Sequence, residues 1–338
     1  MRVLVTGGSG YLGGHTVAAL LRAGGKDVRV FARSPDRVRT ALDPLGVEVK
    51  DVVVGDVTDD DAVEAAIDGC EAVVHAASVY SLDPRDAAEI GRTNARGTKA
   101  VLHAAGRAGL DPIVYVSSYV SFLPATGVLT DESHVGDPPW PYARSKAYSE
   151  AIARLAQTDG TPVTIVSPTS VWGPDDPSCG ESCLLLAVLL RNRAPFRIPG
   201  SLPITDVRYV AAALAAAVEP GKGPRRYLIG GHDTTWRDLI ATLRRLTGRT
   251  LPTIPTPKPV ALGTARVFDG IQRIVPGRAP FGFEAIAIGT QDVRTDDSRA
   301  RAELGVEPIP LEETLIDMIR WMVRAGRIPP RSAGRLAV

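Results

Sequence analysis

The 338-residue sequence has few cysteines, no excess of one charge and no long hydrophobic run. Three cysteines cannot all pair within one chain, so we expect no disulfide framework and a reducing, cytoplasmic setting. Lysine and arginine number 39 against 38 aspartates and glutamates, and like charges form no block. A nucleic-acid-binding protein usually carries a basic stripe, and its absence argues against that class of partner.

Signals for export or membrane insertion are also missing. A signal peptide needs a longer apolar stretch than the opening MRVLVTGGSG contains, followed by a small-residue cleavage site. The longest leucine-rich run, Cys183–Leu190, has eight residues, whereas a membrane-spanning helix needs about 20. We therefore expect this run to be a buried helix segment, and we expect no membrane partner.

The first half of the sequence alternates short apolar runs with helical patterns. The apolar runs predict strands at 2–6, 27–32, within 47–54, and at 72–75, 113–116 and 163–166. Helical patterns surround Val17, Leu20 and Leu21 and occupy 59–67, 86–108 and 142–157. Because strands that alternate with helices through short links form a parallel sheet covered on both faces, we predict an α/β fold with a doubly wound parallel Rossmann sheet.

After about residue 170 the alternation stops, and prolines and glycines become frequent. Isolated helical patterns remain at 207–218, 235–246 and 311–323, and one strand at 227–229 is expected to return to the sheet. We predict a dinucleotide-binding domain at 1–170 and a smaller, mostly helical substrate-binding domain at 171–330. The second domain should cover the carboxyl edge of the sheet, where ligands of open α/β sheets bind.

A glycine-rich loop, TGGSGYLG at 6–13, lies between the first predicted strand and the first predicted helix. Glycines at Gly7, Gly10 and Gly13 permit a tight turn and let the backbone approach a pyrophosphate. The amino end of the following helix supplies free N–H groups to the phosphates. An ordinary glycine turn is the alternative, but the strand–loop–helix context favours a dinucleotide site.

The end of the second strand favours NADP, with NAD as the alternative. An NAD site usually carries an acidic residue there, about 20 residues after the loop, to bind the ribose 2′-hydroxyl. This sequence has Ala32 and then Arg33. A guanidinium suits the 2′-phosphate of NADP through paired hydrogen bonds, although an exposed arginine on a loop would look the same.

A tyrosine and a lysine, Tyr142 and Lys146, are spaced to share one helix face just after Pro141. A nearby ammonium favours ionisation of a phenol, which makes Tyr142 a candidate acid or base. Ser117 and Ser118 follow the fifth strand and reach the same sheet edge. An isolated pair of this kind is usually ordinary surface, but with the glycine loop it indicates a catalytic site.

Together these motifs resemble the extended short-chain dehydrogenase/reductase family, within the NAD-dependent epimerase/dehydratase superfamily. The resemblance covers nearly the whole chain, because further family-like segments occur in order at 55–59 (GDVTD), 75–77 (HAA), 94–98 (NARGT), 167–174 (SPTSVWGP) and 297–305. The sequence departs from the family at Ser167, where an arginine is usual.

The resemblance implies a catalytic set of Ser118, Tyr142 and Lys146. Tyr142 would exchange a proton with the substrate oxygen, and Ser118 would hydrogen-bond that oxygen. Lys146 would bind the nicotinamide ribose and lower the pKa of the tyrosine, while Asp56 would bind the adenine amine. The residues expected to bind the cofactor are Gly7, Gly10, Tyr11, Leu12, Gly13, Arg33, Asp56, Val57, Ala76, Ala77, Ser117, Tyr142, Lys146, Pro168 and Val171.

No metal site is expected. The five histidines show no ligand spacing, and Cys179 and Cys183 have no histidine neighbours, so we expect them to be free thiols. His75, at a strand end, is expected to be structural. Four aromatic residues flank the predicted site and either line an apolar pocket or belong to the core: Tyr80, Tyr119, Phe122 and Trp172.

The segments at 116–120 (VSSYV) and 74–80 (VHAASVY) look most similar to the dihydroflavonol-reductase and 3β-hydroxysteroid-dehydrogenase branch. This implies reduction of a ketone or aldehyde by NADPH, or the reverse oxidation of an alcohol. A sugar-nucleotide epimerase or dehydratase using NAD(P) is the alternative enzyme, and a cofactor-sensing protein without turnover is the alternative outside catalysis. The resemblance also suggests a homodimer through the helices at 86–108 and 142–157, acting on a small-molecule substrate.

Overall fold

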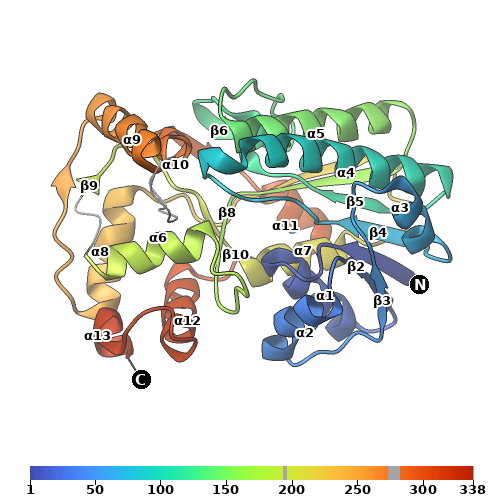
Figure 1. Cartoon of the computed structure of the whole chain (residues 1–338), viewed down its shortest axis with the longest axis horizontal. Coiled ribbons are helices and arrows are strands. Elements are labelled where there is room, and N and C mark those ends of the chain that lie inside the picture. The colour runs from blue at the N-terminus through green and yellow to red at the C-terminus, as the bar shows by residue number, and fades with distance from the viewer. Residues whose placement is uncertain (193–195, 273–281, 338) are drawn as a thin grey trace.

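A seven-stranded parallel sheet forms the centre of the computed structural model, which describes residues 1–192, 196–272 and 282–337 (Figure 1). The strand order is β11-β7-β5-β4-β1-β2-β3, so the order reverses between β1 and β4. The strands are β1 (Arg2–Thr6), β2 (Asp27–Ala32), β3 (Asp51–Val54), β4 (Ala72–His75), β5 (Ile113–Val116), β7 (Val163–Pro168) and β11 (Arg225–Ile229). The doubly wound α/β fold expected from the sequence is confirmed.

Helices cover both faces of this sheet because its strands are apolar on both sides. Val3 and Val5 of β1 pack toward α1 (Tyr11–Ala23) and α7 (Val207–Ala216). Leu4, between them, faces the opposite layer. That layer contains α3 (Asp60–Ile67), α4 (Ala87–Arg107) and α5 (Pro141–Thr158), and α2 (Pro35–Leu42) lies on the side of α1 (Figure 1). Alternate side chains of each strand therefore supply two separate cores.

A second body of helices lies at the end of the molecule away from the N-terminus (Figure 1). Its helices are α6 (Glu181–Leu190), α8 (Trp236–Thr247), α9 (Lys258–Gln272), α10 (Phe283–Gly289), α12 (Leu311–Arg324) and α13 (Pro330–Ala333). Helix α11 (Ser298–Leu304) instead packs against β11 and α7 in the sheet layer. Leu186, Leu243 and Met318 are among the buried residues of its core. The run at 183–190 is therefore a largely buried helix, as expected.

Three small two-stranded pairings connect segments within this second body and connect the body to the sheet layer. They are β8 (Ser170–Trp172) with β10 (Ile204–Asp206), β9 (Phe196–Arg197) with β12 (Ile254–Pro255), and β6 (Gly127–Leu129) with β13 (Val293–Thr295). Each joins segments far apart in the sequence.

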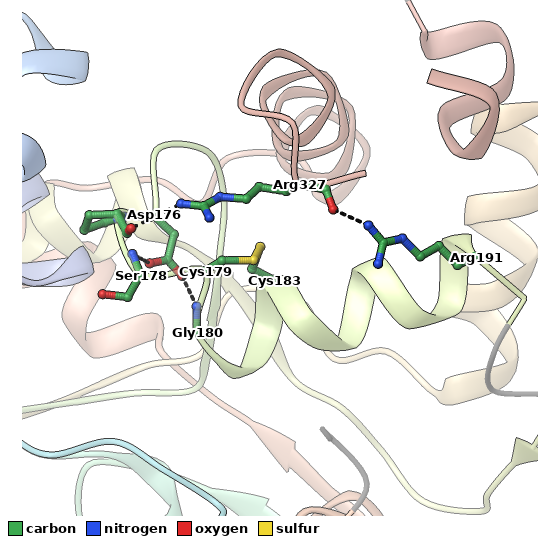
Figure 2. The surroundings of a disulfide bond; sticks show 8 residues. Asp176, Ser178, Cys179, Gly180, Cys183, Arg191 and Arg327 are labelled. Carbon is green, nitrogen blue, oxygen red and sulfur yellow. Dashed lines mark hydrogen bonds between the residues drawn. A yellow bond between two sulfur atoms is a disulfide. The ribbon is translucent and has the colours of Figure 1, made fainter. Parts of the chain in front are cut away.

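One expectation about the cysteines is wrong. Cys179 and Cys183 form a disulfide (Figure 2), with 5.0 Å between their Cα atoms. Cys70 is the free cysteine. Cys179 precedes α6 in a left-handed conformation (φ 46°), which places it one turn before Cys183. This Cα separation lies within the range that a disulfide spans. The carboxylate of Asp176 accepts N–H bonds from Ser178 and Gly180 and so fixes the loop that carries Cys179.

Candidate active site

The glycine loop lies at the carboxyl end of β1, beside the point where the strand order reverses. A Cβ atom on Gly13 would lie 2.1 Å from the carbonyl oxygen of Gly7. A Cβ atom on Gly7 would lie 2.7 Å from the backbone nitrogen of Ala77, and its φ is +76°. Gly10 precedes α1 without a side-chain cap, and the first turn of α1 has no acidic residue. A backbone cradle at an uncapped helix end fits a dinucleotide pyrophosphate.

Other residues of the expected cofactor site lie at the start of α1, just after β4 and at or after the end of β7. Leu12, Ala76 and Val171 are partly buried against the same core cluster, and Pro168 ends β7. The phenol oxygen of Tyr11 is buried and faces Gly173 in the following loop. His15 of α1 hydrogen-bonds the carbonyl of Pro174 at 3.2 Å, and burial lowers the pKa of the imidazole to about 4. A neutral His15 therefore ties α1 to the loop after β8.

Arg33 and Asp56 lie together at the far end of the site. The Oδ1 atom of Asp56 accepts hydrogen bonds from the backbone and hydroxyl of Thr58, at 2.9 and 2.8 Å. The backbone bond is the main cause that lowers the pKa of Asp56, and the charge of Arg33 contributes. Arg33 is exposed just after β2. Val57 packs against Gly97 of α4, where a Cβ atom would lie 2.9 Å from its side chain.

His75 is buried at the end of β4 and has a structural role. Its Nδ1 atom lies 2.8 Å from the hydroxyl of Thr6, which also accepts the N–H of Ala77. Burial, helped by the charge of Lys146, lowers the pKa of His75 to about 3. The neutral ring thus links β1 and β4 directly beneath the glycine loop.

Ser118, Tyr142 and Lys146 come together where β5 ends and α5 begins. Pro141 occupies the first position of α5, and all three side chains are buried. The Lys146 ammonium donates to the carbonyl of Val116 at 3.0 Å and lies 5.6 Å from the ring centre of Tyr115. Ser117, buried beside them, is held by an N–H bond to Val166. The sequence spacing thus leads to a compact group at the carboxyl edge of the sheet.

Burial, and not the lysine, determines the protonation of this group. Burial is the main cause that raises the pKa of Tyr142, while hydrogen bonding to Ser118 opposes the rise. The net shift of the tyrosine pKa is therefore upward. Burial also lowers the pKa of Lys146 to about 8, against the charge of Glu150. Burial therefore destabilises the phenolate form of Tyr142 and the ammonium form of Lys146.

Sequence reasoning missed Glu284, which reaches this site from α10. Its two carboxylate oxygens accept the backbone N–H groups of Tyr142 and Ala143, at 3.2 and 3.0 Å. Trp140 precedes α5 without a side-chain cap, so Glu284 caps the helix in its place. Burial raises the pKa of this carboxyl to about 7. No local signal could have identified it, since it lies 142 residues from Tyr142.

The expected aromatic residues divide between the site and the core. The rings of Tyr80 and Tyr142 are 4.7 Å apart. Tyr119 and Phe122 belong to the same apolar cluster as Tyr142, with Phe283 packed against it. Trp172 instead is fully buried in the core of the helical body. The segments 173–203 and 252–283, expected to cover the pocket, lie partly outside the described residues.

The described ranges contain neither a cluster of metal-binding side chains nor a helix suited to span a membrane. No group of three or more His, Cys, Asp or Glu that could hold a metal occurs there. Among the same residues, no helix combines the length and apolar composition that crossing a bilayer requires.

The geometry defines a dinucleotide-binding protein of the doubly wound class, with a buried tyrosine and lysine at the same carboxyl edge of the sheet as the glycine cradle. The model of the NAD dependent epimerase/dehydratase family matches residues 3–230. The chain therefore belongs to this family, the extended type of short-chain dehydrogenase/reductase, and is an enzyme of that oxidoreductase type.

Known relatives cover nearly the whole chain. Sterol demethylase protein B of Methylococcus capsulatus is 33% identical over 335 residues, which span 97% of this chain and 100% of that protein. The 4-hydroxy-2-methyl-3-oxo-4-farnesyl-3,4-dihydroquinoline-1-oxide ketoreductase of Stigmatella aurantiaca is 29% identical over 340 residues, 97% of this chain and 98% of that protein. The solved UDP-glucose 4-epimerase of Bifidobacterium longum, in complex with NAD+ and UDP, is similar in fold, with a TM-score of 0.73 at 19% identity over 96% of this chain and 99% of that one.

Proposed function

We propose that this chain reduces a ketone or an aldehyde with NADPH, or oxidises the corresponding alcohol in the reverse direction. The observation that carries the proposal is the buried phenol of Tyr142, with Ser118 beside it and Lys146 one turn further along α5. Because burial raises the pKa of Tyr142, the hydroxyl keeps its proton at neutral pH. Carbonyl reduction requires a protonated acid of this kind.

Each of these side chains has a role in the proposal. Tyr142 donates its proton to the substrate oxygen, and Ser118 hydrogen-bonds the same oxygen. Lys146 binds the nicotinamide ribose, and with a pKa of about 8 it remains mostly cationic at neutral pH. Glu284 positions Tyr142 by holding the first N–H groups of α5. A bound dinucleotide supplies the hydride.

NADP is the proposed cofactor, with NAD possible. Arg33 follows β2 where an NAD site usually has an acidic residue, and it is exposed and near Asp56. Thr58 uses only the Oδ1 atom of Asp56, which leaves Oδ2 for the adenine amino group. The glycine cradle and the free N–H groups of α1 hold the pyrophosphate.

We propose an apolar carbonyl compound as the substrate, bound by residues 171–330 against the dinucleotide domain 1–170. The surroundings of Tyr142 are aromatic and aliphatic, and the charged group that acts on it is the carboxyl of Glu284. A nucleotide sugar carries a charged diphosphate, which apolar surroundings of this kind do not stabilise. Two relatives support this choice, since one is named for a sterol and the other for a farnesyl-bearing ketone.

We also propose a homodimer through α4 and α5. These helices pack side by side on one face of the sheet (Figure 1). The outer surface of α5 presents Tyr148 and Leu155, which are 61% and 63% exposed. A second copy of the same two helices would cover both side chains in a four-helix seam.

The experiment is a screen of apolar ketones and aldehydes with NADPH, followed by single-turnover kinetics of Tyr142→Phe. We expect the variant to lose about 10²–10⁴-fold in rate while its affinity for NADPH stays nearly unchanged, because only the proton donor is removed. Tyr148→Phe is the matched control, since Tyr148 is exposed on the same helix and should keep full activity.

Other outcomes assign the alternatives. Conversion of a nucleotide sugar without net consumption of NADPH would identify an epimerase or dehydratase. Tight cofactor binding with no turnover of any carbonyl would identify a cofactor-sensing protein. If Tyr142→Phe keeps more than about a tenth of the rate, the role of Tyr142 as the acid is wrong.

A further inference from the structure

Helix α9 presents an uncharged apolar stripe outward. Val260, Val267 and Ile271 are spaced by seven and four residues, so they lie on one face of the helix, and they are 56%, 66% and 51% exposed. The charged residues in the middle of α9 turn the other way. Arg266 lies 4.7 Å from the ring centre of Phe283, and Asp269 accepts the N–H of Phe283 at 3.0 Å.

Two more exposed apolar side chains lie next to α9. Phe196 of β9 and Ile254 of β12 are direct partners in their two-stranded pairing, and they are 55% and 60% exposed. Ile254 precedes the start of α9 by four residues. In Figure 1, β9 and α9 lie at the same end of the molecule, farthest from the N-terminus. Exposed apolar residues gathered in this way mark an interaction surface.

Three arginines line a cavity of about 530 Å³ at the same end, together with Pro329 and Ser332. They are Arg191, Arg249 and Arg331. Arg191 and Arg249 each stand five residues before the paired Phe196 and Ile254. The cavity residues on α13 and the strand β9 lie at the same end of the molecule (Figure 1).

Two of these arginines bind backbone carbonyl groups. Arg191 donates to the carbonyl of Arg327 at 2.7 Å (Figure 2), and Arg249 donates to the carbonyls of Leu190 and Ser332. Within the described ranges, none of the three arginines forms an ion pair with a carboxylate. A cavity with three such guanidinium groups attracts phosphate.

We infer that this end surface, made of the three arginines and the five exposed apolar side chains, binds the surface of a bilayer that contains anionic phospholipid. The guanidinium groups bind the headgroup phosphates, and the apolar side chains enter the boundary between headgroups and acyl chains. Basic and apolar residues at one end of the molecule are the two features that hold a peripheral protein on such a surface. The inference does not depend on the proposed reaction.

The experiment measures binding of the full-length protein to sedimenting vesicles. We expect binding to phosphatidylcholine vesicles that contain phosphatidylglycerol, weak binding to pure phosphatidylcholine, and loss of binding at high salt. Arg191→Gln and Arg331→Gln should each lower the partition coefficient about fivefold. Phe196→Ser with Ile254→Ser should lower it about tenfold or more.

Matched controls come from the opposite end of the chain. Arg37→Gln and Val54→Ser change an exposed arginine and a valine that is 58% exposed, and both should bind vesicles like the unchanged protein. Melting temperatures verify that each variant folds. If a variant does not fold, the lipid and salt dependence of the unchanged protein still tests the inference.

Three results would overturn the inference. Equal binding to both kinds of vesicle would remove the role of the arginines. Inorganic phosphate that binds at the arginines, with no vesicle binding, would identify a site for a soluble phosphate compound. A change of molecular mass in solution caused by Ile254→Ser would show that a second copy covers this surface.

Discussion

Glu284, on α10, connects the C-terminal part of the chain to the start of the helix that carries Tyr142. Its pKa is about 7 in the folded protein against an ordinary value of 4.5, because the carboxyl is buried. Between these two pH values the folded state holds a proton that the unfolded chain has lost. The contribution of this carboxyl to stability is therefore complete below pH 4.5 and is lost as the pH rises through 7.

We predict that Glu284→Gln flattens this dependence. The pKa difference between 4.5 and about 7 corresponds to about 3 kcal/mol of unfolding free energy. Between these two pH values the unchanged protein should therefore lose about 3 kcal/mol more stability than the variant. Urea unfolding at a series of pH values measures it. Glu132→Gln, at an exposed position, is the control. Parallel pH profiles for Glu284→Gln and the unchanged protein would contradict the prediction.

Arg33 determines cofactor preference if it contacts the 2′-phosphate. We predict that Arg33→Ala weakens NADPH binding by about 10- to 100-fold, the value of a charged hydrogen bond, and leaves NADH binding unchanged. Calorimetric titration with both cofactors measures this, and Arg37→Ala, also exposed nearby, serves as the control. Unchanged NADPH affinity, or tighter binding of NADH by the unchanged protein, would reverse the assignment.

Residues of the site that depend on local spacing could be predicted from the sequence, and those that depend on distant contacts could not. Tyr142 and Lys146 share one helix turn, and the glycines of the loop lie within eight residues. Glu284 meets Tyr142 only through the packing of α10 against α5. The cysteines were misjudged because their number says nothing about the turn that places Cys179 beside Cys183.

At the scale of elements, the glycine loop joins β1 and α1 without room for side chains. We predict that Gly13→Ala destabilises the fold by about 1–3 kcal/mol and abolishes cofactor binding, because the added Cβ would lie 2.1 Å from the Gly7 oxygen and the loop would have to shift. Thermal unfolding and NADPH titration measure the two effects.

The next residue provides the control. A Cβ atom on Gly14 would have its nearest neighbours at 3.5 Å, an ordinary contact. Gly14→Ala should therefore stabilise the protein by up to about 1 kcal/mol through its helix propensity. Equal loss of stability in both variants would show that the close approach at Gly13 is not the cause.

The strands of the central sheet and the helices α4 and α5 were predicted well, whereas α9 and the small pairings were not. The strands of the central sheet are rich in apolar residues, and α4 and α5 were located within one or two residues of their ends. The small pairings β6–β13, β8–β10 and β9–β12 have two or three residues per strand. Such strands exist because a distant segment pairs with them, and no periodicity in the sequence marks them.

At the scale of the whole molecule, the cofactor and the substrate should protect different parts of the chain. We predict that NADPH slows amide hydrogen exchange at 6–13 and 116–118, and that a carbonyl substrate slows it further at 173–192 and 252–272. These segments reach the site from the helical body, for example through the bond of the Glu181 carboxylate to the N–H of Leu82. Protection confined to residues before 170 would contradict a pocket between the two regions.

The late position of β11 has a consequence for synthesis of the protein. β7 pairs with β5 on one side and with β11 on the other, and β11 comes about 60 residues later in the sequence. At the usual pace of about 5–20 residues per second, the ribosome leaves the outer edge of β7 unpaired for several seconds. All six residues of β7 are buried in the finished protein, so the nascent chain exposes an apolar, unpaired edge during this interval. Protection by a chaperone that holds extended apolar segments would matter most in that interval.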